Sequence, residues 1–261
     1  MKLGPLGLET ATAPRRVVAL GASNLTRGFP ILVSAARASA GPDVEVFAAL
    51  GLGRSYGMES RVLARTLPGI LDSGLWAALA GLPPLPTRAV VTDVGNDILY
   101  GAAPARILEW VEEGLGRLRR LTDDVVVAGL PLDAIRALSP AKFLAFRTVL
   151  FHRCRLPFAA VVEAAERTSE GLTRLAAAHG ARFVPLRPEW YGFDPVHFRP
   201  AQWRAAWHEI LGAGGVPEAV SWPEAARLLA LPPERQRLFG VERVRPQRGL
   251  RLAAGGRIWL Y

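Results

Sequence analysis

The chain has 261 residues, of which half are hydrophobic and 21% are charged, so we expect one or two folded domains and exclude wholesale disorder. Its net charge of +9 comes almost entirely from arginine, and the last 30 residues hold seven arginines against two glutamates. Such a basic segment can meet nucleic acid or anionic lipid, but it lacks the interleaved aromatic side chains that stack on single strands, so we do not expect nucleic-acid binding.

Five short apolar segments predict buried β-strands in chain order: residues 16–21, 44–50, 89–94, 124–130 and 182–186. Stretches with helical spacing separate them, among them residues 30–40, 105–121 and 158–179. Apolar strands that alternate with helices are typical of a parallel sheet covered on both faces. The expected fold is therefore α/β: a flavodoxin-like, doubly wound, mainly parallel five-stranded sheet with helices on both faces.

The pattern changes near Leu211, where strand and helix stop alternating. Short segments flanked by proline lead into residues 248–261, and the glycines at 255–256 predict the turn of a terminal hairpin. We therefore expect one domain over residues 1–213 and a small basic appendage over residues 214–261, with short helices and that hairpin.

Other features limit the location and the chemistry. The best apolar run, residues 70–82, is shorter than the roughly 18 residues of a membrane span and is interrupted by Asp72. The first residues lack the pattern of a signal peptide, so we expect a cytoplasmic protein without a membrane span. A lone Cys154 makes neither an internal disulfide nor a thiolate cluster, and the four histidines lack metal-ligand spacing, so no metal is expected.

Polar and small residues follow several of the predicted strands. Ser23 comes after the first strand, Gly51 and Gly53 come after the second, and Asn96 comes after the third. An Asp-x-x-His sequence, Asp194 to His197, follows the fifth. Ligands of doubly wound sheets bind beyond the carboxyl ends of the strands, so we expect these residues to converge on one rim. They comprise a nucleophile, donors for an oxyanion, and a base with its orienting carboxylate.

With these residues in this order, residues 15–213 resemble the SGNH hydrolases, the superfamily of GDSL-type esterases. The resemblance implies that Ser23 is the nucleophile and that Asp194 and His197 complete a catalytic triad. One departure lies in the first block, where the usual Gly-Asp-Ser reads Gly21-Ala22-Ser23. The missing aspartate is not a triad member in that family, so we expect the chemistry to survive, but the substrate is not specified.

The resemblance also implies an oxyanion hole made by the backbone N–H groups of Ser23 and Gly53 and by the side-chain amide of Asn96. Gly53 is preferred because Gly53-Arg54-Ser55 resembles the G-R-S form of some family members, and Gly51 is the alternative. Asp97, next to Asn96, is expected to brace the loop rather than to react.

The expected function is that of a serine esterase that hydrolyses a small-molecule or acylated ester through an acyl-serine intermediate, without a cofactor. The same residues also suit an acyltransferase or a thioesterase. A non-catalytic binding protein on a hydrolase fold is the alternative from another class. The natural ester and the oligomeric state are left open.

Rival sites have weaker support. Gly51, Gly53 and Gly57 only approximate the dinucleotide-binding G-x-G-x-x-G, because the third glycine is one place late and the motif follows the second strand. No G-x-S-x-G nucleophile elbow occurs, and His152 with Cys154 makes a poor catalytic pair in an arginine-rich helical stretch. Four aromatic residues flank the Asp-x-x-His loop, and we expect packing from most of them and pocket lining from one or two: Trp190, Tyr191, Phe193 and Phe198.

Overall fold

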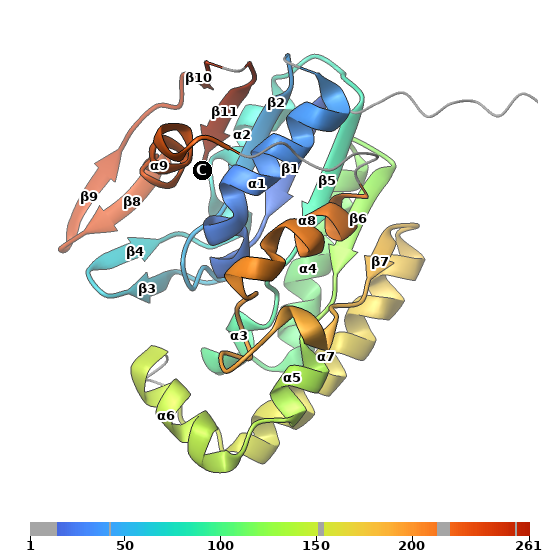
Figure 1. The fold of residues 1–261 in the computed structure, drawn as a ribbon, viewed down its shortest axis with the longest axis vertical. Helices are drawn as coiled ribbons and strands as arrows, with labels where there is room; N and C mark the ends of the chain where they lie inside the picture. Colours follow the sequence, from blue (N-terminus) through green and yellow to red (C-terminus); the bar gives the residue numbers. More distant parts are fainter. Residues whose placement is uncertain (1–14, 42, 151–153, 213–219, 254) are drawn as a thin grey trace, which may run out of the picture.

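The computed structural model describes residues 15–41, 43–150, 154–212, 220–253 and 255–261 (Figure 1). Its centre is a seven-stranded sheet in the order β10-β11-β2-β1-β5-β6-β7. Five of its strands are those expected from the sequence, and they run parallel to one another: β1 Arg16–Leu20, β2 Glu45–Ala49, β5 Thr87–Val91, β6 Asp124–Ala128 and β7 Arg182–Val184. The sheet has seven strands and not the predicted five, because two strands of the C-terminal segment join it beyond β2. The order places β2 on one side of β1 and β5, β6 and β7 on the other, which is the doubly wound arrangement that the sequence predicts.

The alternation of side chains along the strands builds two cores, one on each face of the sheet. Val17 of β1 belongs to the core under α1 (Ser23–Ala40), α8 (Trp203–Leu211) and α9 (Trp222–Leu229). Its neighbour Val18 belongs to the core under α2 (Leu75–Ala80), α4 (Pro104–Arg119) and α7 (Phe158–Ala178). Because both faces are covered, the strands read as continuous apolar runs of valine, alanine and leucine.

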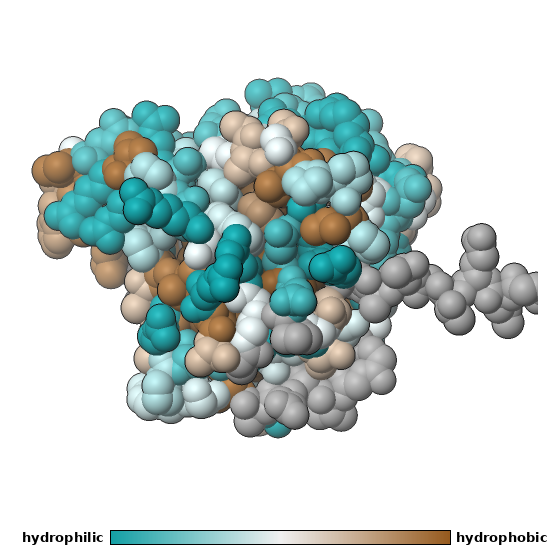
Figure 2. Space-filling model, turned by 90° about the horizontal axis from the view of Figure 1, so that it is seen from above, coloured by the Kyte–Doolittle hydropathy of each residue, from teal (hydrophilic) through white to brown (hydrophobic). Residues whose placement is uncertain are grey.

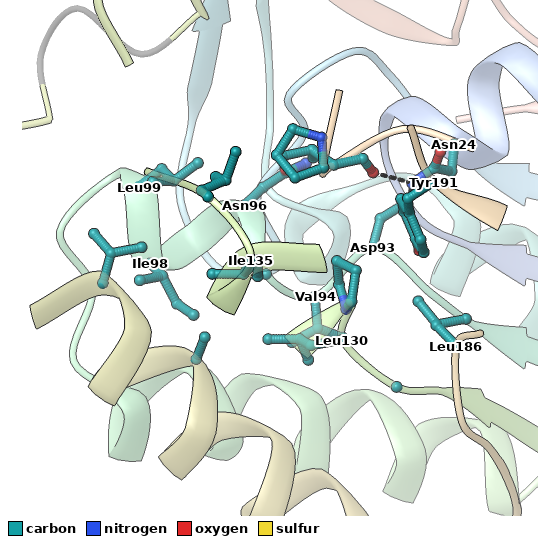
Figure 3. A pocket seen from close by; sticks show the side chains of 18 of the residues that line it. Asn24, Asp93, Val94, Asn96, Ile98, Leu99, Leu130, Ile135, Leu186 and Tyr191 are labelled. Atoms are coloured by element: carbon teal, nitrogen blue, oxygen red, sulfur yellow. Dashed lines mark hydrogen bonds between the residues drawn. The ribbon is translucent and has the colours of Figure 1, made fainter. Parts of the chain in front are cut away.

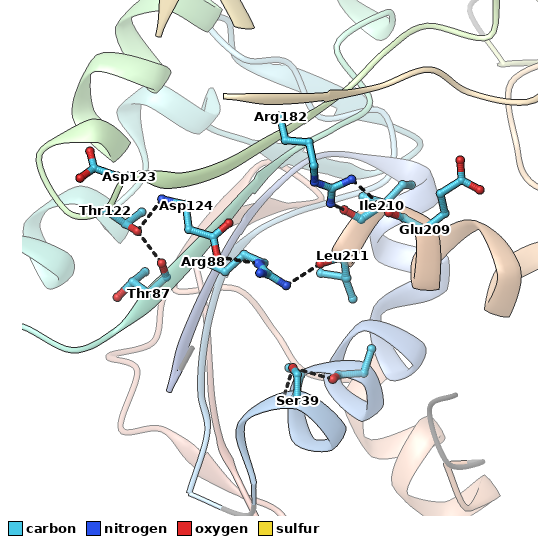
Figure 4. Close-up of polar contacts among 12 residues, drawn as sticks. Ser39, Thr87, Arg88, Thr122, Asp123, Asp124, Arg182, Glu209, Ile210 and Leu211 are labelled. Carbon is cyan, nitrogen blue, oxygen red and sulfur yellow. Dashed lines mark hydrogen bonds and ion pairs between the residues drawn. The ribbon is translucent and has the colours of Figure 1, made fainter. Parts of the chain in front are cut away.

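The amino ends of the strands are tied to the end of α8 (Figure 4). Arg88 pairs with Asp124 of the neighbouring strand at 2.8 Å and donates to the Leu211 carbonyl at 2.6 Å. Arg182 donates to the Ile210 carbonyl at 2.6 Å. Cations at the last carbonyl groups of a helix satisfy acceptors that the helix itself leaves unpaired. These contacts therefore hold the amino ends of the strands, at the edge of the sheet opposite the carboxyl ends where the candidate site residues are expected.

Beyond β2 the sheet continues into the C-terminal segment. β11 (Arg257–Leu260) pairs parallel with β2, and β10 (Leu250–Arg251) pairs antiparallel with β11. The Trp259 ring stacks on Phe47 of β2 with centroids 4.3 Å apart. The division into domains at 213 and 214 stays a prediction, and that boundary lies outside the described residues.

A second sheet, which we call the small sheet, stands to one side of the first (Figure 1). It consists of two antiparallel hairpins in the order β3-β4-β8-β9. The strands are β3 Ser60–Val62, β4 Arg65–Leu67, β8 Arg235–Leu238 and β9 Val241–Val244. Its strands are short and rich in arginine, so they carry little of the apolar alternation from which the sequence predicts a strand. Among the described residues, no helix has the length and the apolar character that crossing a bilayer requires.

Candidate active site

Ser23 lies at the turn from β1 into α1, at the carboxyl end of a central strand. The strand ends at Leu20, and the helix begins at Ser23 itself. The hydroxyl oxygen of Ser23 lies 2.9 Å from Nε2 of His197, a residue 174 positions away in the chain. The fold therefore brings together the two residues that the sequence assigns as nucleophile and base.

Asp194 and His197 form a self-contained turn. Oδ2 of Asp194 lies 2.6 Å from Nδ1 of His197, while its Oδ1 accepts the backbone N–H groups of Val196 at 2.9 Å and His197 at 3.1 Å. With a proton on Nδ1 directed at the carboxylate, Nε2 is left as an acceptor for the Ser23 hydroxyl. Burial on its own raises the pKa of Asp194, but the hydrogen bond and charge of His197 and the two N–H groups hold this pKa below its ordinary value.

Asp93, which the sequence analysis does not assign to the site, holds the turn before α1. It follows β5 with a left-handed backbone, φ +60°, a conformation that aspartate tolerates better than most residues. Its Oδ2 accepts the N–H groups of Ala22 at 2.8 Å and Leu25 at 3.0 Å, on either side of Ser23 in the turn. The carboxylate thus satisfies backbone donors that the start of a helix leaves unpaired, and it fixes the path of the chain around Ser23.

Asn24 connects this turn to the loop that carries His197 (Figure 3). Its Nδ2 donates to Oδ1 of Asp93 and to the carbonyl of Val196, each at 2.9 Å. Its Oδ1 accepts the N–H of Phe198 at 2.9 Å. The side chain next to the nucleophile therefore grips the backbone on both sides of His197. The one sequence feature that points to Asn24 is its place beside the predicted nucleophile.

Asn96 begins α3 (Asn96–Leu99), just beyond β5. It is only 5% exposed, and within the described part of the chain its Nδ2 has no hydrogen-bond partner. A buried N–H group without an acceptor costs free energy, and this one lies in the wall of a pocket, where it is free to bind a ligand. It has the donor that the predicted oxyanion role requires.

Gly51 and Gly53 lie in the turn after β2, and each position has its own reason to be glycine. Gly53 has φ +63°, and a Cβ there would lie 2.7 Å from the hydroxyl of Tyr100, which donates to the Gly53 carbonyl at 2.5 Å. A Cβ on Gly51 would lie 2.2 Å from Cδ1 of Leu67. Which of the two supplies an oxyanion donor stays a prediction, with Gly53 preferred.

Asp97 braces the same turn from α3, in the manner expected from the sequence. Its carboxylate is completely buried and accepts a hydrogen bond from the Ser55 hydroxyl and another from the Tyr56 N–H at 3.1 Å. Burial raises the pKa of Asp97 to about 6, although these two hydrogen bonds favour the charged form. Together with the bond from Tyr100 to Gly53, Asp97 ties α3 to the glycine turn.

Arg54 anchors the turn from the other side. Its buried guanidinium donates to the carbonyls of Pro68 and Leu50, each at 3.1 Å, and to the Tyr261 backbone oxygen beyond β11. Burial lowers the pKa of Arg54 to about 9, with a smaller contribution from the charge of Arg65. The C-terminal strand is thus linked directly to the predicted oxyanion turn.

An apolar pocket opens beside Asn96 and Asn24 (Figure 3). Apart from the polar groups at its rim, the lining side chains are mainly aliphatic and come from α3, α5 (Leu132–Arg136), α6 (Pro140–Leu150), α7 and the loops around them. The principal apolar residues are Val94, Ile98, Leu99, Leu130, Ile135 and Leu186. Such a pocket suits an apolar group of a ligand whose polar part lies at the rim.

Most of the other residues considered in the sequence pack against neighbouring side chains and do not line the pocket. Of the four aromatic residues near the Asp-x-x-His loop, only Tyr191 lines the pocket; Trp190 and Phe198 pack edge to face in the core, and Phe193 is exposed. Gly57 lies against the Trp110 indole, where a Cβ would come within 2.1 Å of a ring atom.

In the described part of the chain, no group of three or more His, Cys, Asp or Glu side chains is placed to hold a metal ion. Cys154 is buried, and His152 lies outside the described residues.

No protein-family model and no curated protein sequence matches the chain. Among solved structures it is similar to the psychrotrophic esterase EstA from Pseudoalteromonas sp. inhibited by monoethylphosphonate, at 12% identity and a TM-score of 0.48, over 76% of this chain and 96% of that one. An inhibitor-bound aryl esterase of M. smegmatis is 19% identical at a TM-score of 0.48, over 74% and 94%. TesA is 17% identical at 0.45, over 82% and 99%. At these values the neighbours do not establish what this chain does.

Proposed function

We propose that this protein is a serine esterase of the SGNH type, which hydrolyses a carboxylic ester through an acyl-serine intermediate. The observation that carries the proposal is the hydrogen-bond chain from Ser23 through His197 to Asp194, with its distances of 2.9 and 2.6 Å. Nucleophile, base and orienting acid within hydrogen-bond reach are the arrangement that activates a serine hydroxyl.

In the proposed reaction, Ser23 Oγ attacks the ester carbonyl carbon while Nε2 of His197 takes the hydroxyl proton. The tetrahedral intermediate collapses, the bond to the alcohol breaks, and the alcohol leaves with the proton from His197. A water molecule then attacks the acyl carbon and gives its proton to His197. The acid is released as Ser23 Oγ regains that proton. Asp194 keeps the imidazole in one orientation and stabilises its positive charge during both steps.

The negative charge of the tetrahedral intermediate requires donors aimed at its oxygen. Nδ2 of Asn96, which has no hydrogen-bond partner among the described residues, is the side-chain donor in this proposal, and the backbone N–H groups of Ser23 and Gly53 are the other two donors. Donors that are held in place before the reaction cost no reorganisation when the charge develops. The bonds from Asp97 and Tyr100 to the glycine turn support this part of the proposal, because they restrain the turn relative to Asn96.

The aliphatic lining of the pocket beside Asn96 supports an ester with an apolar group on at least one side of the carbonyl. Binding of that group would hold the reacting carbon in place without taking part in the chemistry. A panel of esters with a graded acyl chain length measures this preference directly.

The test of the proposal is covalent labelling. The purified protein should react with a fluorophosphonate probe at Ser23 and should hydrolyse activated esters, and Ser23→Ala should abolish both activities. Cys154→Ser is the matched control, since it replaces a buried residue that has no role in the proposed reaction and should leave turnover within a few-fold of the parent. Labelling at another residue, or undiminished turnover by Ser23→Ala, would refute the assignment.

A further inference from the structure

The two hairpins of the small sheet each carry a large apolar side chain at the turn. Leu63, between β3 and β4, is 91% exposed, and Phe239, between β8 and β9, is 80% exposed. The turns lie side by side, because the Phe239 N–H donates to the Ala64 carbonyl at 2.9 Å (Figure 1). We call Leu63 and Phe239 the apolar tips.

Both apolar tips combine two unfavourable features. Their backbones are left-handed, with φ +54° at Leu63 and +51° at Phe239, a conformation in which glycine or asparagine is less strained than a large side chain. Their side chains gain nothing from burial within the fold, since they face solvent. Strain together with exposure at two neighbouring turns indicates that the side chains are used in contact with something outside the chain.

The surroundings of the apolar tips are basic. The small sheet and its connection, residues 59–67 and 234–248, hold seven arginines and three glutamates, a net charge of +4. Two of the arginines are paired, Arg237 with Glu59 and Arg235 with Glu242. The others lack an acidic partner within the described residues, and four of these are exposed: Arg61, Arg243, Arg245 and Arg248. In Figure 2, apolar patches stand among hydrophilic side chains on this part of the molecule.

This chemistry favours an anionic lipid surface over a protein or a nucleic acid. Next to the apolar tips, β9 exposes Val241 and Val244 as well as Glu242 and Arg243. Charged side chains thus interrupt the apolar ones, whereas a protein interface of stable size has a contiguous apolar core. Phosphate groups alone would attract the arginines but would leave Leu63 without a partner. A bilayer offers both layers at once, anionic headgroups for the arginines and hydrocarbon for the tips.

The small sheet also adjoins the candidate active site. A cleft lined by Arg61, Ala64, Arg237 and Phe239 extends to Tyr100, whose hydroxyl donates to the Gly53 carbonyl. A lipid surface bound at the apolar tips would therefore lie on the side of the molecule from which this cleft leads toward the glycine turn.

We propose that the small sheet docks the protein on anionic lipid surfaces, with Leu63 and Phe239 entering the apolar layer and the exposed arginines contacting the headgroups. The substrate class that follows is an ester presented at such a surface, and this second part rests on the proposed function.

Sedimentation with vesicles tests the docking. The whole protein should bind vesicles of phosphatidylglycerol and phosphatidylcholine and should bind much less to phosphatidylcholine alone. The double substitution Leu63→Asn with Phe239→Asn should lower the binding constant at least about tenfold, by the loss of two buried apolar side chains. Asparagine tolerates a left-handed backbone, so this variant should fold and should keep its turnover of a short water-soluble ester.

Substitution of the exposed arginines tests the contribution of charge to vesicle binding. Arg243→Gln with Arg245→Gln should weaken binding to the anionic vesicles by about fivefold for each arginine. Arg174→Gln is the matched control, because Arg174 is an exposed arginine on α7 that forms no ion pair within the described residues, and this variant should bind like the parent.

Three outcomes would overturn the docking: vesicle binding that is unchanged in the double variant, a change of oligomeric state caused by that variant, or nucleic-acid binding that depends on the same residues. Ser23→Ala should bind vesicles like the parent. The two proposals therefore fail separately, since loss of vesicle binding with intact turnover removes only the docking, and persistent turnover by Ser23→Ala removes only the serine mechanism.

Discussion

Asp97→Asn removes a completely buried carboxylate whose pKa is raised to about 6 from an ordinary value of 3.8. Because the folded state holds this proton more tightly than the unfolded state, the stabilisation linked to it is complete below the unfolded pKa and is lost as the pH rises through 6. A difference of about 2 pKa units corresponds to about 3 kcal/mol. Asparagine does not titrate, so the parent should lose about 3 kcal/mol of unfolding free energy relative to Asp97→Asn between about pH 4 and pH 7.

The measurement is urea unfolding of both proteins over this pH range, with the difference in unfolding free energy plotted against pH. Asp72→Asn, which replaces an exposed carboxylate, is the matched control. A flat difference for Asp97→Asn, or one that changes in the parent's favour as the pH rises, would refute the reasoning from burial. Ester turnover of Asp97→Asn should fall as well, since Ser55 and Tyr56 lose a charged acceptor.

Three further predictions concern the site. Asn96→Ala should lower kcat by about 10²–10³ with little change in KM, because its amide acts on charge that exists only in the transition state; kinetics that show an altered KM alone would contradict this. Asp93→Asn should lower kcat and the rate of fluorophosphonate labelling together, since an amide cannot accept all three of the present hydrogen bonds without turning a donor toward one of them. Ile135→Trp should raise KM for long-chain esters and leave short-chain esters unchanged, by filling the pocket, which the graded ester panel measures.

The parallel core and the proximity of Ser23, His197 and Asp194 could be predicted from the sequence, because short local patterns indicate both. Strands buried on both faces are short apolar runs, and the topology then sets their carboxyl ends at one rim. Ser23 and His197 are separated by 174 positions, yet both follow such runs, so their meeting follows from the order of the strands. The Asp-x-x-His turn is local, and its hydrogen bonds span only two or three residues.

The residues that hold the candidate site in place are not indicated by any local sequence pattern. Asn24 reaches Asp93 across 69 positions and Val196 across 172, and nothing near Asp93 in the sequence distinguishes it from a residue that ends a strand. The pairing of β11 with β2 and the anchoring of Arg54 by the Tyr261 oxygen likewise depend on contacts between distant segments. Such pairings are decided by tertiary packing, to which local propensity contributes little.

A single segment supports both halves of the proposed machinery. Residues 93–100 begin with Asp93, which holds the nucleophile turn, continue with Asn96 and Asp97, and end with Tyr100, which contacts Gly53. Its helix, α3, has four residues and is too short to be stable by itself. Its stability comes from β5, which pairs with β1 and β6 on both sides, and from the buried carboxylate of Asp97. The segment is therefore restrained by the sheet before it and by hydrogen bonds to the neighbouring turn. Oxyanion donors must be held in a fixed position, because a displacement of about 1 Å is enough to lose much of their effect.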